Sequence, residues 1–121
     1  ELIGPALETL VLQEILARNE YQKWDYRPYF WRTRNHIEVD FILYGERGLK
    51  AIEVKSSFRL RQNDYEGLLE FRKDYPKSEL FLIYGGTEEK IYRDINIIPA
   101  ELFLRHMDRW IYGGSSFWFP D

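Results

Sequence analysis

The chain of 121 residues contains no cysteine, which excludes disulfide frameworks, thiolate nucleophiles and zinc–thiolate sites. Its two histidines, His36 and His106, lie far apart, so a histidine-rich metal centre or a Ser-His-Asp triad has little material. No uninterrupted apolar run approaches the roughly 20 residues of a membrane helix. The chemistry that remains available is that of carboxylates, amines and hard metal ions.

The first five residues include neither an initiator methionine nor the start of a signal peptide, so we expect a fragment of a longer chain. A length of 121 residues suits one domain, and 45% hydrophobic residues suit a folded one. The net charge of −3 argues against a protein that coats nucleic acid by bulk charge, but it leaves room for a local basic cleft. We therefore expect a soluble cytoplasmic domain with no membrane partner.

Hydrophobic periodicity and turn residues predict a mixed α/β domain over residues 1–106. The expected helices cover residues 5–18, 63–75 and 99–106, and the expected strands cover 29–33, 37–44, 49–56, 79–84 and part of 89–98. Asn63 or Asp64 is the expected N-cap of the second helix, and Gly67 inside it costs about 1 kcal/mol relative to alanine. The aromatic-rich residues 107–121 are expected to pack on the domain or on a partner.

The hairpin over residues 37–56 carries the most informative pattern, because charged and bulky residues alternate along both strands. Successive side chains of a strand point to opposite faces, so Glu38 and Asp40 should share one face while Val39 and Phe41 share the other. Such alternation is also typical of a strand face that is simply exposed to water, and this interpretation stays open beside a functional one.

The turn between Gly45 and Gly48 sets which residues of the hairpin face each other. If it is centred there, Asp40 faces Glu53, and Glu38 faces Lys55. Two opposed carboxylates repel each other, and a divalent cation between them reverses that effect. Lys55 could then orient a water molecule or stabilise charge on a phosphate, whereas on a solvated face it would only pair with Glu38.

Glu8 favours the functional interpretation. It falls inside the apolar arc of the first helix, so its carboxylate should look toward the core. A buried carboxylate needs a partner or a cation. A third inward acid beside Asp40 and Glu53 therefore favours a metal site.

Four short motifs occur in order on these elements. They are Gly4-Pro5-Ala6-Leu7-Glu8, Phe30-Trp31-Arg32, Glu38-Val39-Asp40-Phe41 and Ile52-Glu53-Val54-Lys55. The set resembles the PD-(D/E)XK nuclease superfamily, in particular its archaeal Holliday-junction resolvase and restriction-endonuclease-like branches, although Val39 stands where the superfamily's name has proline. More closely, residues 3–106 resemble a domain of unknown function at the end of a large family of prokaryotic AAA-type ATPases.

The resemblance implies a restriction-endonuclease-like α/β fold, with a four-stranded mixed sheet flanked by helices in the order αβββαβ. It implies Mg²⁺ or Mn²⁺ bound by Asp40 and Glu53, with Glu8 as a further or indirect ligand and Lys55 as the catalytic amine. The implied activity is hydrolysis of DNA by the C-terminal domain of an ATPase. The implied partners are the N-terminal ATPase region of the same parent chain, DNA and further copies of the chain.

Basic side chains next to aromatic ones can bind a nucleic-acid strand, through charge on the phosphates and stacking on the bases. The candidate nucleic-acid contacts are Arg32, Arg34, Arg59 and Arg61, and residues 47–61 carry a local excess of positive charge that includes Lys50. In the alternative interpretation, the same charges have no role in binding and simply keep an edge strand soluble. Two functional hypotheses therefore remain, a metal-dependent nuclease and a catalytically silent module that binds DNA or a partner for the ATPase.

Overall fold

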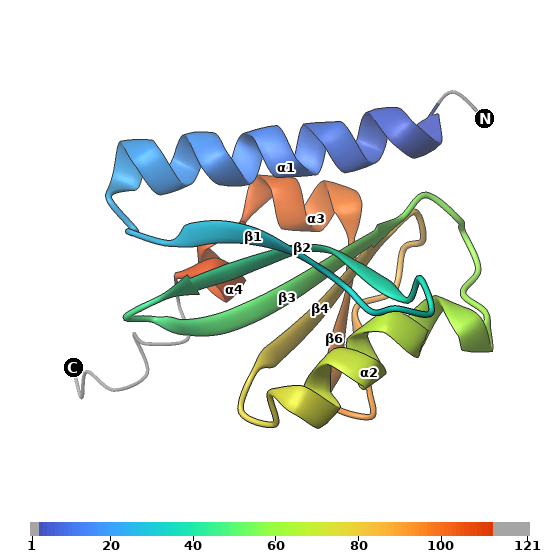
Figure 1. The fold of residues 1–121 in the computed structure, drawn as a ribbon. Coiled ribbons are helices and arrows are strands. Elements are labelled where there is room, and N and C mark those ends of the chain that lie inside the picture. The colour runs from blue at the N-terminus through green and yellow to red at the C-terminus, as the bar shows by residue number, and fades with distance from the viewer. Residues whose placement is uncertain (1–2, 113–121) are drawn as a thin grey trace.

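The computed structural model describes residues 3–112, which form a mixed sheet with helices on both faces (Figure 1). The helical segments are α1 (Ile3–Gln22), η1 (Gln62–Tyr65), α2 (Glu66–Asp74), α3 (Ala100–Arg105) and α4 (Asp108–Ile111). The strands are β1 (Arg27–Arg32), β2 (Glu38–Gly45), β3 (Gly48–Lys55), β4 (Glu79–Tyr84), β5 (Lys90–Tyr92) and β6 (Ile95–Pro99). The predicted α/β class is confirmed.

The sheet has six strands in the order β1-β2-β3-β4-β6-β5, so the count of four that the resemblance implies was wrong. The pairs β1·β2, β2·β3 and β5·β6 are antiparallel, whereas β3·β4 and β4·β6 are parallel. The segment expected to hold one strand holds both β5 and β6, joined by Arg93 and Asp94 at φ 52° and 68°. A two-residue hairpin turn needs such left-handed conformations and usually signals them with Asn-Gly, which is why this turn escaped prediction.

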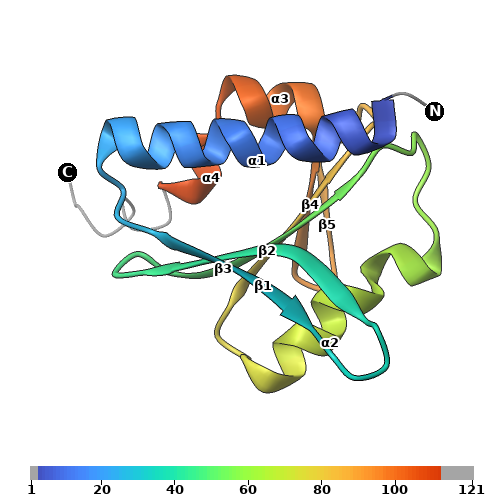
Figure 2. The same cartoon turned by 45° about the horizontal axis from the view of Figure 1, so that its top comes forward.

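Helices α1 and α3 cover one face of the sheet, and α2 covers the other (Figures 1 and 2). The core on the α1 face includes Val11, Ile15, Phe41, Ile52 and Phe103. A second cluster on the α2 face includes Val39, Ile42, Ala51, Leu68 and Phe71. None of the described helices is both long and apolar enough to cross a membrane.

The α2 helix packs very closely on β2, and this explains the glycine inside it. A Cβ atom at Gly67 would overlap the carbonyl oxygen of Glu38. The helical segment begins earlier than predicted, at Gln62, because the backbone N–H of Arg61 donates to Asp64 Oδ2 at 2.7 Å. Neither Asn63 nor Asp64 is therefore the N-cap. The 3₁₀ turn and the start of α2 therefore lie against Glu38, the first residue of β2.

Residues 107–112 pack on the domain rather than leaving it. The Trp110 ring stacks on Phe103 with centroids 5.9 Å apart, and Tyr112 stacks on Trp24 at 6.3 Å. The hydroxyl of Tyr26 donates to the carbonyl oxygen of Ile111. The remainder of the predicted aromatic extension, residues 113–121, lies outside the described part of the chain.

Candidate active site

A polar cavity of about 290 Å³ lies where the start of β2, the end of β3 and the start of α2 meet. Its walls are formed by His36, Ile37, Glu38, Asp40, Glu53, Lys55, Asn63, Asp64, Glu66 and Gly67. The structure thus brings together three of the four residues predicted to act as a site, namely Asp40, Glu53 and Lys55. Five of the lining side chains are carboxylic acids and one is an amine, so the cavity favours cations.

Asp40 and Glu53 face each other as the hairpin turn predicts, because the register runs from Gly45↔Gly48 to Phe41↔Ile52. Beyond Phe41, the two strands are joined by hydrogen bonds from backbone N–H groups to side-chain carboxylates. The N–H of Asp40 donates to Glu53 Oε1 at 3.1 Å, and the N–H of Val54 donates to Asp40 Oδ2 at 2.7 Å. Each carboxylate is therefore fixed by the backbone of the opposite strand through one oxygen.

The predicted alternation of faces along β2 was wrong at this point. Tyr29 pairs with Ile42 and Trp31 with Val39, so Asp40 and Phe41 both lie opposite Phe30. This β-bulge reverses the alternation, and Val39 and Phe41 consequently pack in the two different core clusters. Bulges often occur next to active sites, where they redirect a side chain. Here Asp40 is one of the two residues of the bulge.

Lys55 pairs within the site rather than across the hairpin as a solvated face would require. Its Nζ lies 3.3 Å from Glu53 Oε2, and about a third of its side chain is exposed. Glu38 instead lies 3.8 Å from Arg32, with both side chains largely exposed. The amine therefore stands at the open side of the cavity, next to a buried carboxylate.

Burial and, after it, the nearby charge of Glu53 raise the pKa of Asp40 to about 8, against the hydrogen bond from Val54, which lowers it. Burial also raises the pKa of Glu53, while the charge of Lys55 lowers it. The pair therefore retains a proton at neutral pH, as closely placed carboxylates do. A divalent cation would displace that proton on binding.

Glu8 reaches the two acids from α1 without lining the cavity. It is half-buried, as the helical wheel predicts. Its charge contributes to the raised pKa of both Asp40 and Glu53, and a side-chain hydrogen bond links it to Asp40. The α1 helix thus brings a third carboxylate up to the pair.

The donor set fits Mg²⁺ or Mn²⁺ as an ion that is completed by water and substrate. Within residues 3–112, no group of three or more His, Asp or Glu side chains is arranged as a ready-made metal site. Mg²⁺, however, is usually held by one or two carboxylates plus waters and phosphate oxygens rather than by an all-protein cage. Asp40 and Glu53 meet that requirement, because each keeps one carboxylate oxygen that no backbone N–H occupies.

The predicted nucleic-acid contacts do not form one patch with the cavity. Arg32 is engaged by Glu38, Arg34 and Arg61 are exposed, and Arg59 lines a separate hollow. Lys50, which contributed to the predicted basic segment, is wholly buried and pairs with Glu79. The basic surface is therefore smaller than the sequence indicates.

Sequence reasoning missed the wall of the cavity opposite the hairpin. His36 lies in the β1–β2 loop at φ 66°, and Asp64 and Glu66 come from η1 and α2. Nothing in the local sequence marks these residues. Asp64 and Glu66 reach the cavity because α2 packs closely on β2 at Gly67.

A family of domains of unknown function, DUF4143, matches residues 3–103, so the chain belongs to this family. No curated protein matches the chain, and no solved structure does. The match covers α1, the hairpin, α2 and all strands of the sheet.

Proposed function

We propose that this DUF4143 domain is a Mg²⁺- or Mn²⁺-dependent nuclease related to the PD-(D/E)XK superfamily, and that it forms the C-terminal domain of a prokaryotic AAA-type ATPase. The observation that carries the proposal is the arrangement of Asp40 and Glu53, held side by side at the point where β2 and β3 separate, with Lys55 beside them. Two carboxylates buried side by side repel each other and destabilise the fold, so a purely structural role does not account for them.

Each residue has a distinct role in the proposed reaction. Asp40 and Glu53 hold the metal ion, which supplies Lewis acidity toward a phosphate oxygen and a more acidic water molecule. Lys55 donates hydrogen bonds to the attacking water or to the phosphate, where its charge offsets the charge that develops in the transition state. Glu8 supports Asp40 through their hydrogen bond. The arginines Arg32, Arg34, Arg59 and Arg61 do not line the cavity, so they contact the DNA backbone away from the cleaved phosphate.

The order of elements supports a restriction-endonuclease-like fold. From α1 through β1, β2, β3 and α2 to β4, the chain follows the αβββαβ order that the superfamily implies. The additional strands β5 and β6 extend the sheet beyond β4, on the side away from the hairpin. They therefore lie away from β2 and β3, which carry the proposed site.

Calorimetric titration with Mg²⁺ or Mn²⁺ tests the site directly. We expect the wild-type protein to bind the ion with proton release and Asp40→Ala to lose the binding heat, because the metal replaces the proton that the pair retains. Asp74→Ala removes an exposed acid at the end of α2 and serves as the control. Equal binding heats for wild type and Asp40→Ala would contradict the proposed site.

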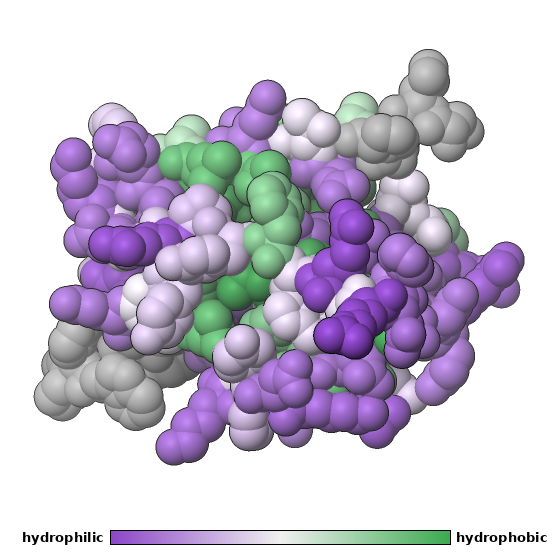
Figure 3. Space-filling model, viewed as in Figure 1, coloured by the Kyte–Doolittle hydropathy of each residue, from purple (hydrophilic) through white to green (hydrophobic). Residues whose placement is uncertain are grey.

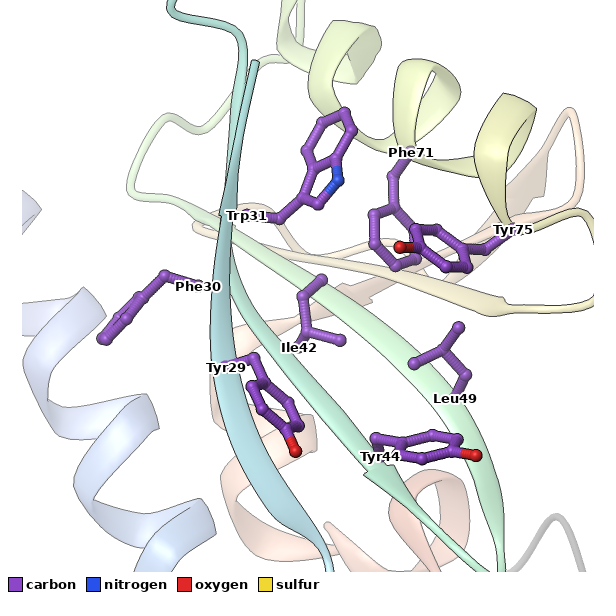
Figure 4. Close-up of a pocket in the computed structure, with 8 residues that line it drawn as sticks. All are labelled: Tyr29, Phe30, Trp31, Ile42, Tyr44, Leu49, Phe71 and Tyr75. Carbon is purple, nitrogen blue, oxygen red and sulfur yellow. The ribbon is translucent and has the colours of Figure 1, made fainter. Parts of the chain in front are cut away.

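A second candidate function is a silent module that binds a partner, and an aromatic groove favours it. The groove, of about 470 Å³, is lined by eight residues, Tyr29, Phe30, Trp31, Ile42, Tyr44, Leu49, Phe71 and Tyr75, none of which is charged (Figure 4). All except Phe30, which points toward α1, lie on the α2 side of β1. Figure 3 shows an apolar area on this face, surrounded by hydrophilic residues. Such a surface suits a protein segment rather than a phosphate backbone.

Binding to the ATPase region of the parent chain separates the two candidates. A silent module requires Tyr29→Ala to weaken that binding and predicts no cleavage by any variant. A nuclease predicts cleavage that survives Tyr29→Ala, because the groove contributes no residue to the carboxylate pair.

A further inference from the structure

A second hollow lies immediately beside the proposed site. It measures about 420 Å³ and is lined by Phe58, Arg59, Leu60, Tyr84, Thr87, Glu88 and Lys90. Tyr84 is the residue of β4 that pairs with Lys55 of β3 in the parallel ladder. Neighbouring strands lie about 4.8 Å apart. The hollow therefore begins one strand away from the proposed catalytic amine, at the same carboxyl end of the parallel strands, where ligands bind in many α/β sheets.

The loop that forms one wall of this hollow presents an aromatic ring and positive charge to the solvent. Phe58 has 64% of its surface exposed, although it follows a buried strand by only three residues. Arg59 and Arg61 are exposed on either side of Leu60, and residues 54–62 contain no acid. An exposed phenyl ring followed directly by cationic side chains has no value for solubility, and it matches the composition of surfaces that bind nucleic-acid strands.

The loop is held in position before any ligand arrives. The backbone N–H of Gly85 donates to the carbonyl oxygen of Ser57 at 3.0 Å. A Cβ atom at Gly85 would overlap the carbonyl oxygen of Ser56, so the loop is packed directly on the end of β4. The opposite wall is closed by Tyr84, whose hydroxyl donates to the carbonyl oxygen of Glu88 at 2.8 Å. Lys90 lies 3.8 Å from Glu88 and adds a cation at the rim.

We propose that this hollow is a nucleobase site, in which Phe58 stacks on an unpaired base of a DNA strand while Arg59 and Lys90 contact its phosphates. The proposal rests on the proposed nuclease function and names its substrate class, DNA with an unpaired nucleotide next to the phosphate at Asp40 and Glu53. A base inside a duplex is stacked and paired, so its face is closed to Phe58. Only a single-stranded segment, a flap or a frayed end can present one.

Binding of short fluorescently labelled DNA, measured by anisotropy, tests the site. All proteins carry Asp40→Asn so that the strand stays intact. The probes are a single strand, the same strand with abasic nucleotides, which keep the phosphates and lack the bases, and a blunt duplex of the same sequence. We expect the intact single strand to bind best. Adding Phe58→Ala should weaken that binding roughly 5- to 100-fold and abolish the preference over the abasic strand.

Two further variants show that stacking is responsible. Phe58→Trp should retain the preference, because it keeps an aromatic face. Tyr21→Ala, which removes a ring that is 85% exposed on α1, should leave binding unchanged. Equal binding of intact and abasic strands, or no effect of Phe58→Ala, would overturn the proposal. Absence of binding to any strand would also overturn it and leave the hollow to a protein partner.

The outcomes for binding and for cleavage are separable. If the protein shows the Phe58-dependent preference while the domain with intact Asp40 cleaves nothing, the nucleobase site stands and the nuclease proposal fails. If the domain cleaves duplex and single strand alike and Phe58→Ala changes neither binding nor cleavage, the nucleobase site fails and the nuclease stands.

Discussion

Asp40 and Glu53 are each held by a backbone N–H of the opposite strand, and this exchange defines the site at the level of single residues. The bond from Val54 to Asp40 lowers the pKa of that carboxyl, but burial and the charge of Glu53 outweigh it. The pair is therefore costly to ionise without a cation. That cost makes its function measurable through stability as well as through activity.

Asp40→Asn should stabilise the metal-free protein increasingly as the pH rises. The pKa of Asp40 is about 8 in the folded state and about 4 when unfolded, so between these values only the folded state binds the proton. The contribution of this group to stability consequently falls from pH 4 to pH 8. The asparagine variant has no such loss, so the difference in unfolding free energy between it and the wild type should grow by about 1–3 kcal/mol between pH 5 and pH 9. Urea unfolding in the presence of a chelator measures it, and a gap independent of pH would contradict the raised pKa.

Glu53→Gln and Lys55→Ala should affect metal binding in opposite ways. A neutral amide is a poor ligand for a hard divalent ion, so Glu53→Gln should weaken Mn²⁺ binding at least tenfold. Lys55→Ala removes a cation whose Nζ is 3.3 Å from Glu53, so it should leave the affinity unchanged or raise it. Calorimetry of both variants gives the comparison. Equal loss of affinity in the two would show that Lys55 supports the site structurally instead.

The buried ion pair between Lys50 and Glu79 should respond unequally to loss of either partner. Glu79→Gln leaves a wholly buried ammonium without its counter-charge and should cost about 3 kcal/mol of unfolding free energy. Lys50→Met fills the same space with apolar atoms and leaves Glu79, which is half exposed, to water, so it should cost less than about 1 kcal/mol. Urea unfolding tests both, with Glu70→Gln of the exposed pair to Lys73 as the control. The reverse order would contradict the burial of Lys50.

At the level of elements, the site depends on how closely α2 approaches β2. Helix propensity favours alanine over glycine by about 1 kcal/mol, so Gly67→Ala would stabilise an isolated helix. In the folded domain the added methyl group meets the carbonyl oxygen of Glu38, and α2 must shift. We expect Gly67→Ala to destabilise the domain by about 1–3 kcal/mol and to weaken metal binding. Lys73→Ala, on an exposed turn of α2, should change stability by less than about 0.5 kcal/mol. A stabilised Gly67→Ala protein would refute the close packing.

The elements also show how far the sequence determines the site. The turn at Gly45 and Gly48 was sufficient to predict which residues of β2 and β3 face each other, because hairpin register follows turn geometry. The bulge at Asp40 was not predictable, since it arises from the pairing of β2 with β1. The acidic wall from η1 and α2 depends on helix packing and was missed for the same reason. Local pattern thus predicts pairing within a hairpin, whereas contacts between distant elements need the folded chain.

At the level of the whole molecule, metal binding should control stability. An ion that binds only the folded state raises the free energy of unfolding by about 2.7 kcal/mol when its concentration is a hundred times Kd. For a domain of this size that corresponds to an increase in Tm on the order of 10 °C. The increase should be larger at pH 8 than at pH 6, because the ion competes with the proton on the pair. Asp40→Asn should show no increase. An unchanged wild-type melting curve at saturating Mn²⁺ would contradict a metal site.

Cleavage of DNA by the isolated domain tests the proposed function most directly. Single-stranded, duplex and branched DNA are incubated with Mn²⁺ and wild type, Glu53→Gln or Lys55→Ala. We expect nicking by wild type alone, since Glu53→Gln loses the ion and Lys55→Ala loses the group that offsets transition-state charge. Activity that survives equally in Glu53→Gln would reveal a contaminating nuclease, and absence of cleavage by a wild-type protein that binds Mn²⁺ would contradict catalysis by this domain.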